Sequence, residues 1–104
     1  MIKGIGNNTR VEDRYGETAV VLHGTPVVKV KRVNAVRGRG FDMWNITLNS
    51  GGYRTATTKR RMNEVSEEYD LGFKVYQKNF DWDIDIMQGT LKFIDGITFN
   101  VAVR

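Results

Sequence analysis

The residues best suited to binding an anion lie together between Arg54 and Arg61. This segment holds four cationic side chains and three threonines at the predicted start of a helix. Free amide N–H groups and the helix dipole attract anions at such a position, and hydroxyl and cationic groups can contact phosphates. An ordinary threonine N-cap explains the hydroxyls equally well. However, cations in the first turn oppose the dipole, so Lys59, Arg60 and Arg61 suggest a phosphate-binding role.

A second basic segment, residues 29–39, lies near three aromatic residues in the sequence. Proteins that bind single-stranded nucleic acid combine cations along the backbone with rings that stack on bases. Trp44 is in phase with Ile46 and Leu48, which favours a core position, so Tyr53 or Phe41 is the expected stacking residue. The predicted nucleic-acid-binding residues are Lys29, Lys31, Arg32, Arg37, Arg39, Tyr53, Arg54, Thr57, Thr58, Lys59, Arg60 and Arg61.

The charge distribution also favours a polyanionic partner for the middle of the chain. Residues 25–61 carry nine basic side chains and one acidic side chain, Asp42. Residues 62–104 carry four basic and eight acidic side chains. Because charge asymmetry steers partners over long range, a polyanion would approach the first region and avoid the second.

Residues typical of catalysis are sparse. The sequence has no cysteine, and its one histidine, His23, lies beside a Gly-Thr-Pro turn without a nucleophile or acid at a motif spacing. The glycines at 51–52 lack the spacing of a nucleotide-hydrolysing loop. Asp81, Asp83 and Asp85 share one strand face, but pairing with Lys74 and Lys78 explains them without a metal. We therefore predict a protein that is not an enzyme and has no metal or cofactor.

One helix is predicted, over about residues 57–69. Thr57 or Thr58 can cap its start, Met62, Val65 and Tyr69 form a narrow apolar stripe, and Gly72 suits the left-handed position after its end. The remaining chain predicts about six short strands. The expected fold is α+β: a small, mostly antiparallel bent sheet or barrel with one inserted helix. Residues 1–104 form one domain, and residues 1–16 are expected to be a flexible or loosely packed arm.

The strand at 73–78 and the strand at 81–86 predict a hairpin with a defined register. A connection at Asn79-Phe80 sets lysines opposite aspartates on one face and apolar residues opposite each other on the other face. A longer loop remains an alternative because Phe80 is a poor residue for a tight turn. The expected pairs are Lys78–Asp81, Tyr76–Asp83, Lys74–Asp85, Val75–Ile84 and Phe73–Ile86.

Two further turns are predicted from glycine and asparagine. Residues 49–52 (Asn-Ser-Gly-Gly) are expected to turn the chain into a short returning strand at 53–56. Asp95-Gly96 is expected to join 91–94 and 97–103 in a second hairpin.

The string from Ile46 to Asn63, of the type LNSGGxRTxTTKxRMN, followed by residues 75–78 and 80–82, is similar to small uncharacterised proteins encoded by bacteriophages. The resemblance implies a phage origin and the host-cell cytoplasm, and it assigns no residue a role. A cytosolic location also fits the sequence, which shows no stretch with the hydrophobicity of a signal peptide or membrane span.

These observations lead to two functional hypotheses. The first is a module that binds DNA or RNA through phosphate contacts. The alternative is a non-enzymatic phage factor that binds and modulates a host protein as an inhibitor or adaptor, with an aromatic anchor and charge steering. A minor structural component of the virion is a third, weaker candidate. The sequence leaves open the oligomeric state and whether the basic segments share one face.

Overall fold

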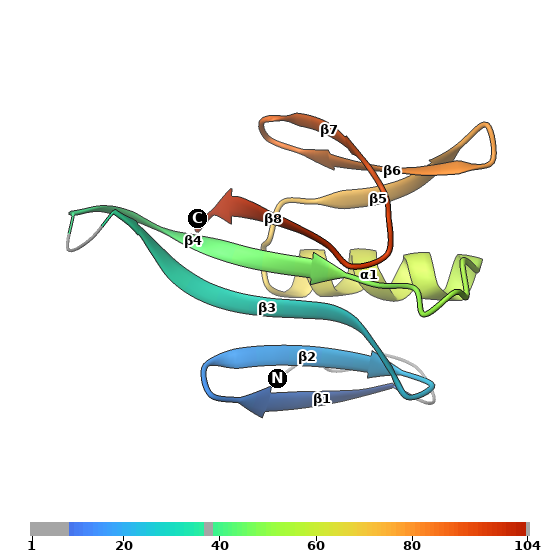
Figure 1. The fold of residues 1–104 in the computed structure, drawn as a ribbon, viewed down its shortest axis with the longest axis horizontal. Helices are drawn as coiled ribbons and strands as arrows, with labels where there is room; N and C mark the ends of the chain where they lie inside the picture. The colour runs from blue at the N-terminus through green and yellow to red at the C-terminus, as the bar shows by residue number, and fades with distance from the viewer. Residues whose placement is uncertain (1–8, 37–38, 104) are drawn as a thin grey trace.

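The computed structural model describes residues 9–36 and 39–103, apart from the side chains of residues 34–41. In this part of the chain, one helix accompanies two antiparallel sheets (Figure 1). Sheet A has the strand order β1-β2-β3-β4-β8, and sheet B has the order β5-β6-β7. The elements are β1 (Thr9–Arg14), β2 (Glu17–Leu22), β3 (Thr25–Val36), β4 (Arg39–Leu48), α1 (Ala56–Glu68), β5 (Lys74–Lys78), β6 (Asp81–Ile86), β7 (Gly89–Lys92) and β8 (Ile97–Ala102).

The predicted α+β class, the antiparallel pairing and the inserted helix are confirmed. The alternative of a closed barrel is wrong, because sheet A is open, with β1 and β8 at its edges. Strand β8 follows sheet B in the sequence and returns to pair with β4, from Met43 opposite Ala102 to Leu48 opposite Ile97. The chain therefore completes sheet A only after sheet B.

Within the expected flexible or loosely packed arm at residues 1–16, Thr9–Arg14 forms strand β1. This strand pairs with β2 over its whole length, from Thr9 opposite Leu22 to Arg14 opposite Glu17. Only Val11 packs against the core. One apolar residue in an edge strand gives no periodicity to recognise. The rest of the arm, residues 1–8, lies outside the described residues.

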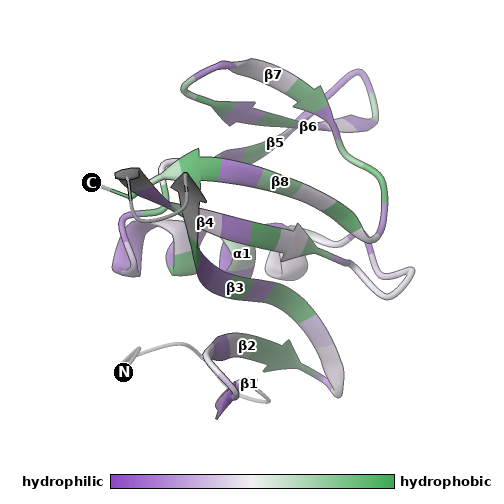
Figure 2. Cartoon of the chain, turned by 60° about the vertical axis from the view of Figure 1, so that its left-hand side comes forward, coloured by the Kyte–Doolittle hydropathy of each residue, from purple (hydrophilic) through white to green (hydrophobic). Residues whose placement is uncertain are grey.

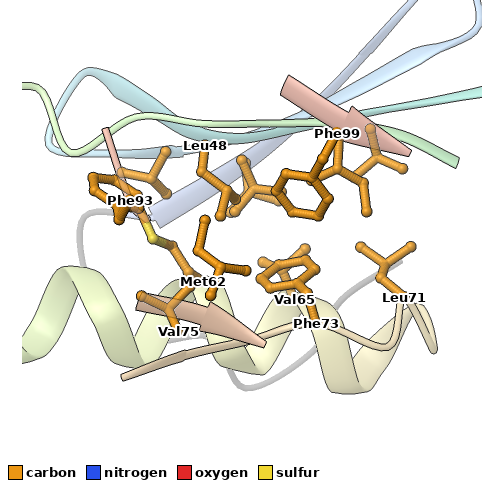
Figure 3. Packing of buried hydrophobic residues seen from close by; sticks show 14 of the residues in the cluster. Leu48, Met62, Val65, Leu71, Phe73, Val75, Phe93 and Phe99 are labelled. Atoms are coloured by element: carbon orange, nitrogen blue, oxygen red, sulfur yellow. The ribbon is translucent and has the colours of Figure 1, made fainter. Parts of the chain in front are cut away.

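The hydrophobic core lies between one face of sheet A and the helix with sheet B. Leu48 and Phe99 of sheet A face Met62 and Val65 of α1, and Phe73 closes the layer from the sheet B side (Figure 3). Met62 and Val65 are completely buried, which confirms the predicted stripe, and Tyr69 is half-buried beside them. Hydrophobic and hydrophilic residues alternate along β4 and β8, so the opposite face of sheet A is polar (Figure 2).

The N-cap of helix α1 lies two or three residues before the predicted one. Thr55, rather than Thr57 or Thr58, is the N-cap, and its Oγ1 accepts a hydrogen bond from the Thr58 amide at 3.2 Å. At the other end, the Leu71 amide donates to the Ser66 carbonyl at 2.8 Å, and Asp70 adopts the left-handed conformation with φ 53°. Gly72 also has positive φ but follows two residues later.

Two helix side chains close the free edge of β5. The Asn63 amide donates to the Val75 carbonyl and accepts from the Val75 N–H, both at 2.8 Å. The Ser66 hydroxyl donates to the Phe73 carbonyl at 2.6 Å and accepts from the Phe73 N–H at 3.0 Å. Because these are backbone groups that a neighbouring strand would otherwise pair, α1 takes the place of a fourth strand in sheet B.

The predicted register of the β5–β6 hairpin is confirmed for the pairs from Lys74–Asp85 to Lys78–Asp81. The expected Phe73–Ile86 pair is not part of the ladder, because Phe73 precedes β5. Its backbone bonds to the Ser66 side chain instead. The connection is a two-residue turn in which Asn79 and Phe80 both have positive φ, 50° and 69°. The longer loop considered from the sequence is therefore not formed.

Replacing Phe80 by glycine is expected to raise the free energy of unfolding by about 1 kcal/mol, because an L-residue with a side chain is disfavoured in this conformation and Asn-Gly is the preferred pair for the turn. The Phe80 ring is 93% exposed and loses little burial. Urea unfolding measures the change as a higher midpoint with an unchanged m-value. A lower midpoint would show that the ring stabilises the hairpin through contacts.

Two predicted connections are wrong. Residues 53–55 form no returning strand but lead directly into α1. Residues 91–94 and 97–103 form no hairpin, because β7 pairs with β6 whereas β8 pairs with β4. The Asp95-Gly96 turn instead carries the chain from one sheet to the other, and the Gly96 amide donates to the Leu48 carbonyl at 2.9 Å. A turn motif alone does not identify the sheet of the following strand.

The protein is expected to lose stability above about pH 10, partly through Tyr69. Burial raises the pKa of the Tyr69 phenol above its ordinary value, and the Asp13 carboxylate acts in the same direction. Between the unfolded and folded pKa values the unfolded chain binds fewer protons, so stability falls as pH rises. Urea midpoints measured from about pH 8 to 11 should fall less steeply for Tyr69→Phe than for the unmodified chain. Identical slopes would contradict this prediction.

Candidate nucleic-acid interface

The loop at residues 49–55 is held in place by its own side chains and by the turn after β7. The Asn49 Oδ1 accepts from the Gly51 N–H at 2.7 Å, which closes a tight turn within the loop. The buried Ser50 donates from both its amide and its hydroxyl to Asp95 Oδ1, each at 2.7 Å. The Asn-Ser-Gly-Gly string therefore has a structural role: it fixes the approach to α1.

Gly51 allows this loop to lie against the turn between β2 and β3. Its φ is +63°, and a Cβ atom at this position would come within 2.7 Å of Cγ2 and Oγ1 of Thr25. A larger residue would have to push Thr25 away in addition to adopting an unfavourable backbone conformation. Glycine therefore lets the start of α1 and the β2–β3 turn approach each other, although they are distant in the sequence.

Two of the predicted phosphate-binding cations lie over buried aromatic rings. The Arg54 guanidinium carbon is 5.1 Å from the centroid of Phe93, and the Lys59 ammonium nitrogen is 6.0 Å from that of Trp82. Phe93 and Trp82 contact each other edge to face at 5.2 Å. Cation–π attraction holds both charges at the start of α1 without a carboxylate. This supplies a structural partner for Lys59, which the sequence alone did not explain.

Within residues 9–36 and 39–103, Arg54, Lys59 and Arg60 take part in no ion pair. The first turn of α1 contains no acidic residue. Arg61 differs from them: its guanidinium pairs with Glu64 at 3.1 Å, and its side chain is only 12% exposed. We name Arg54, Lys59 and Arg60 the helix-start cations, and they are the part of the predicted site whose charge remains available to a ligand.

A pocket of about 530 Å³ lies between the start of α1 and the β2–β3 turn. Its apolar wall includes Leu22 and Val27, and its polar wall includes His23, Thr25, Tyr53 and Thr57. Among the described residues that line it, none is Lys, Arg, Asp or Glu. Of these lining residues, Tyr53, Thr57 and Thr58 are predicted site residues, whereas His23, Thr25 and Ser50 are not. No spacing pattern links residues 23–25 with residues 50–58, so the sequence contained no signal for their proximity.

Thr58 is predicted to donate to phosphate, but it lies buried in the wall of this pocket. Its Oγ1 is 3.1 Å from Oγ1 of the N-cap Thr55, so its hydroxyl belongs to the cap. Thr57 is exposed, and Tyr53 is 69% exposed. Tyr53 and Thr57 are therefore accessible beside the helix-start cations, whereas Thr58 is not.

The basic residues of β3 lie apart from the start of α1. Lys29 and Lys31 alternate with the buried Val28 and Val30, so they point away from the helix, toward the polar face of sheet A. Lys31 stands opposite Glu17 in β2. The structure therefore divides the basic residues between two faces.

The other predicted residues of this segment differ in their surroundings. Arg32 forms an ion pair with Asp42 at 2.7 Å and lies 5.7 Å from the ring centroid of the half-buried Trp44. Trp44 packs against the core, as its phase predicts. Arg37 and the side chains of Arg39 and Phe41 lie outside the described residues.

Asp81 and Asp85 of β6 bond to side chains of the neighbouring strands. Asp85 accepts from the hydroxyls of Tyr76 at 3.0 Å and Thr90 at 2.8 Å, and Asp81 forms an ion pair with Lys92 at 3.1 Å. The bond to Asp85 raises the pKa of Tyr76 above its ordinary value. Lys74 and Lys78 stand opposite Asp85 and Asp81 in the register but form no ion pair within the described residues.

No group of three or more His, Asp or Glu side chains in the described part of the chain could hold a metal ion.

Comparison with known proteins identifies one family. A model of the Kyanoviridae Gp96 protein family matches residues 3–100, so the chain belongs to this family of bacteriophage proteins. The phage origin implied by the sequence is thereby confirmed. Neither a curated protein nor a solved structure matches the chain. Among the described residues, no helix has the length and apolar character to cross a membrane.

Proposed function

We propose that this Kyanoviridae Gp96 family protein binds nucleic acid through the start of α1. Arg54, Lys59 and Arg60 contact phosphates, and the exposed Tyr53 stacks on a base. The observation that carries the proposal is the group of helix-start cations, which have no carboxylate partner in the described structure although acidic side chains are frequent elsewhere in the chain. Charge left unpaired at one end of the molecule suits a polyanionic ligand.

The geometry also favours a single strand over a duplex. A stacking ring reaches a base only where the base is accessible, and the exposed Tyr53 precedes Arg54 in the loop before α1 instead of forming part of a helix face that could enter a groove. Cations that follow the backbone and a ring that stacks on bases are the two elements of sequence-tolerant single-strand binding. We therefore expect single-stranded DNA or RNA to be preferred.

Fluorescence anisotropy with labelled single-stranded and double-stranded oligonucleotides tests the proposal. The titrations are made at about 50 mM and about 200 mM salt, because phosphate neutralisation releases counterions and gives a steep salt dependence. We expect binding at the lower salt concentration, a preference for the single strand and a marked loss of affinity at the higher concentration. Absence of binding to either oligonucleotide at the lower concentration would reject the proposal.

A host protein is the second candidate partner, and the exposure of Phe80 is the observation that favours it. An aromatic ring at the tip of a hairpin, 93% exposed, is the kind of anchor that protein interfaces use. Either partner would be met in the host-cell cytoplasm. A pull-down from nuclease-treated host lysate separates the candidates. Recovery of one stoichiometric protein, lost in Phe80→Gly, would favour the protein partner.

A further inference from the structure

We infer that the pocket between α1 and the β2–β3 turn receives one unstacked base of the bound strand. The inference rests on the proposed function and adds to it a specific place for a base. Its volume of about 530 Å³ lies within the range of small-molecule sites, about 300–1,000 Å³. Such a cavity distinguishes this end of the molecule from a flat basic surface, which could contact only the backbone.

The lining of the pocket fits a neutral, planar ring. Leu22 and Val27 are buried and give it an apolar floor, and Tyr53 gives it an aromatic wall. The part of its lining that the structure describes has no lysine, arginine, aspartate or glutamate. A phosphate would meet no cation among these described lining residues, whereas a base can be covered by the apolar side chains and stack on Tyr53.

Unpartnered polar groups in the pocket can bond to the edge of a base. The hydroxyls of Thr25, Tyr53 and Thr57 and the His23 imidazole form no hydrogen bond within the described structure. A hydroxyl can both donate and accept, so these groups can bond to the mixed donors and acceptors of any base edge. These polar groups therefore favour the binding of a base but do not select one particular base.

The charge around the pocket suits the strand to which such a base is attached. Arg54 follows Tyr53 in the chain, and Lys59 and Arg60 follow Thr57 within the same helical turn. A cavity whose described lining carries no Lys, Arg, Asp or Glu, with lining residues next in the chain to cations that form no ion pair in the described structure, matches a neutral base joined to an anionic backbone. The backbone would run across the start of α1, and the base would enter between the helix and the β2–β3 turn.

The test compares two labelled strands of about twelve nucleotides, oligothymidine and an abasic strand with the same backbone. Anisotropy titrations at about 50 mM salt should show roughly 5- to 150-fold tighter binding of oligothymidine, the range expected for one stacked base. Thr57→Trp, which fills the pocket from its exposed wall, and Tyr53→Ala should both reduce the affinity for oligothymidine to that for the abasic strand. The salt dependence should remain unchanged, because the phosphate contacts remain.

Tyr15→Ala is the matched control, since Tyr15 is 99% exposed in the β1–β2 turn, at the opposite end of β2 from His23. It should leave both affinities unchanged. The thermal midpoint of each variant checks its fold. Equal affinities for the two strands would reject base binding in the pocket, and so would a folded Thr57→Trp variant that still prefers oligothymidine. Neither result would contradict the phosphate contacts. Absence of binding to both strands would reject the proposed function itself.

Discussion

Replacing Arg54, Lys59 and Arg60 together by glutamine is expected to weaken binding to single-stranded nucleic acid on the order of 100-fold at about 0.1 M salt. Each phosphate contact contributes about 0.7 to the slope of log affinity against log salt for a single strand, so three contacts contribute about 2. The slope should fall by this amount, and the loss of affinity follows from it. Anisotropy titrations at several salt concentrations measure both quantities.

The matched control has the same change of charge on another face. Arg14, Lys29 and Lys31 lie on the polar side of sheet A, and replacing these three by glutamine also removes three positive charges. If binding occurs at the start of α1, this control loses much less affinity and keeps most of the slope. Equal losses in the two variants would show that net charge alone determines binding and would contradict a defined site.

Replacing Asn63 by alanine is expected to lower the free energy of unfolding by about 2–3 kcal/mol. The Val75 N–H and C=O both bond to the Asn63 side chain at 2.8 Å, and alanine leaves both without a partner. An unsatisfied backbone group costs about 1–3 kcal/mol when buried, so two such groups would cost about 2–6 kcal/mol, and the half-buried position of Asn63 places the total near the lower end of this combined range. Urea unfolding measures the loss, and hydrogen exchange should show reduced protection of the Val75 amide.

Asn45→Ala provides the comparison for this substitution. The Asn45 side chain donates to Asn100 at 3.0 Å on the exposed polar face of sheet A, where water can replace the lost bond. Its removal should change the free energy of unfolding by less than about 0.5 kcal/mol. Similar effects of the two substitutions would show that the contacts between α1 and β5 have no special importance for stability.

The parts of the fold that could be predicted from the sequence are those fixed by local patterns. The β5–β6 register follows from two strand faces that agree, with lysines opposite aspartates and Val75 opposite Ile84. The stripe of Met62 and Val65 similarly predicts which side of the helix is buried. In both cases, the interacting residues lie within about a dozen positions of each other, so alternation or helical periodicity is sufficient.

The wrong predictions concern which strands pair with each other, because local sequence patterns do not determine the pairing partner of a strand. The Asp95-Gly96 motif correctly predicts a turn, but it contains no information that β8 pairs with β4 rather than with β7. The pairing of β8 depends on contacts with residues that are distant in the sequence. The candidate site was predictable only in part for the same reason. Tyr53 and the helix-start cations belong to one continuous segment, whereas the opposite wall of the pocket comes from His23 and Thr25.

The position of β8 at the edge of sheet A has a consequence for the order of folding. Thr47 and Thr98 bond across the β4–β8 pair although they are 51 residues apart in sequence. Closing a flexible loop of that length costs about 3.5 kcal/mol in chain entropy, beyond a constant contribution. The elements between them have mainly short-range contacts and can form before the loop closes. If the helix and sheet B form first, they bring β8 closer to β4 and so reduce the length of flexible chain that must close. The pairing of β8 with β4 would then form in the transition state or after it.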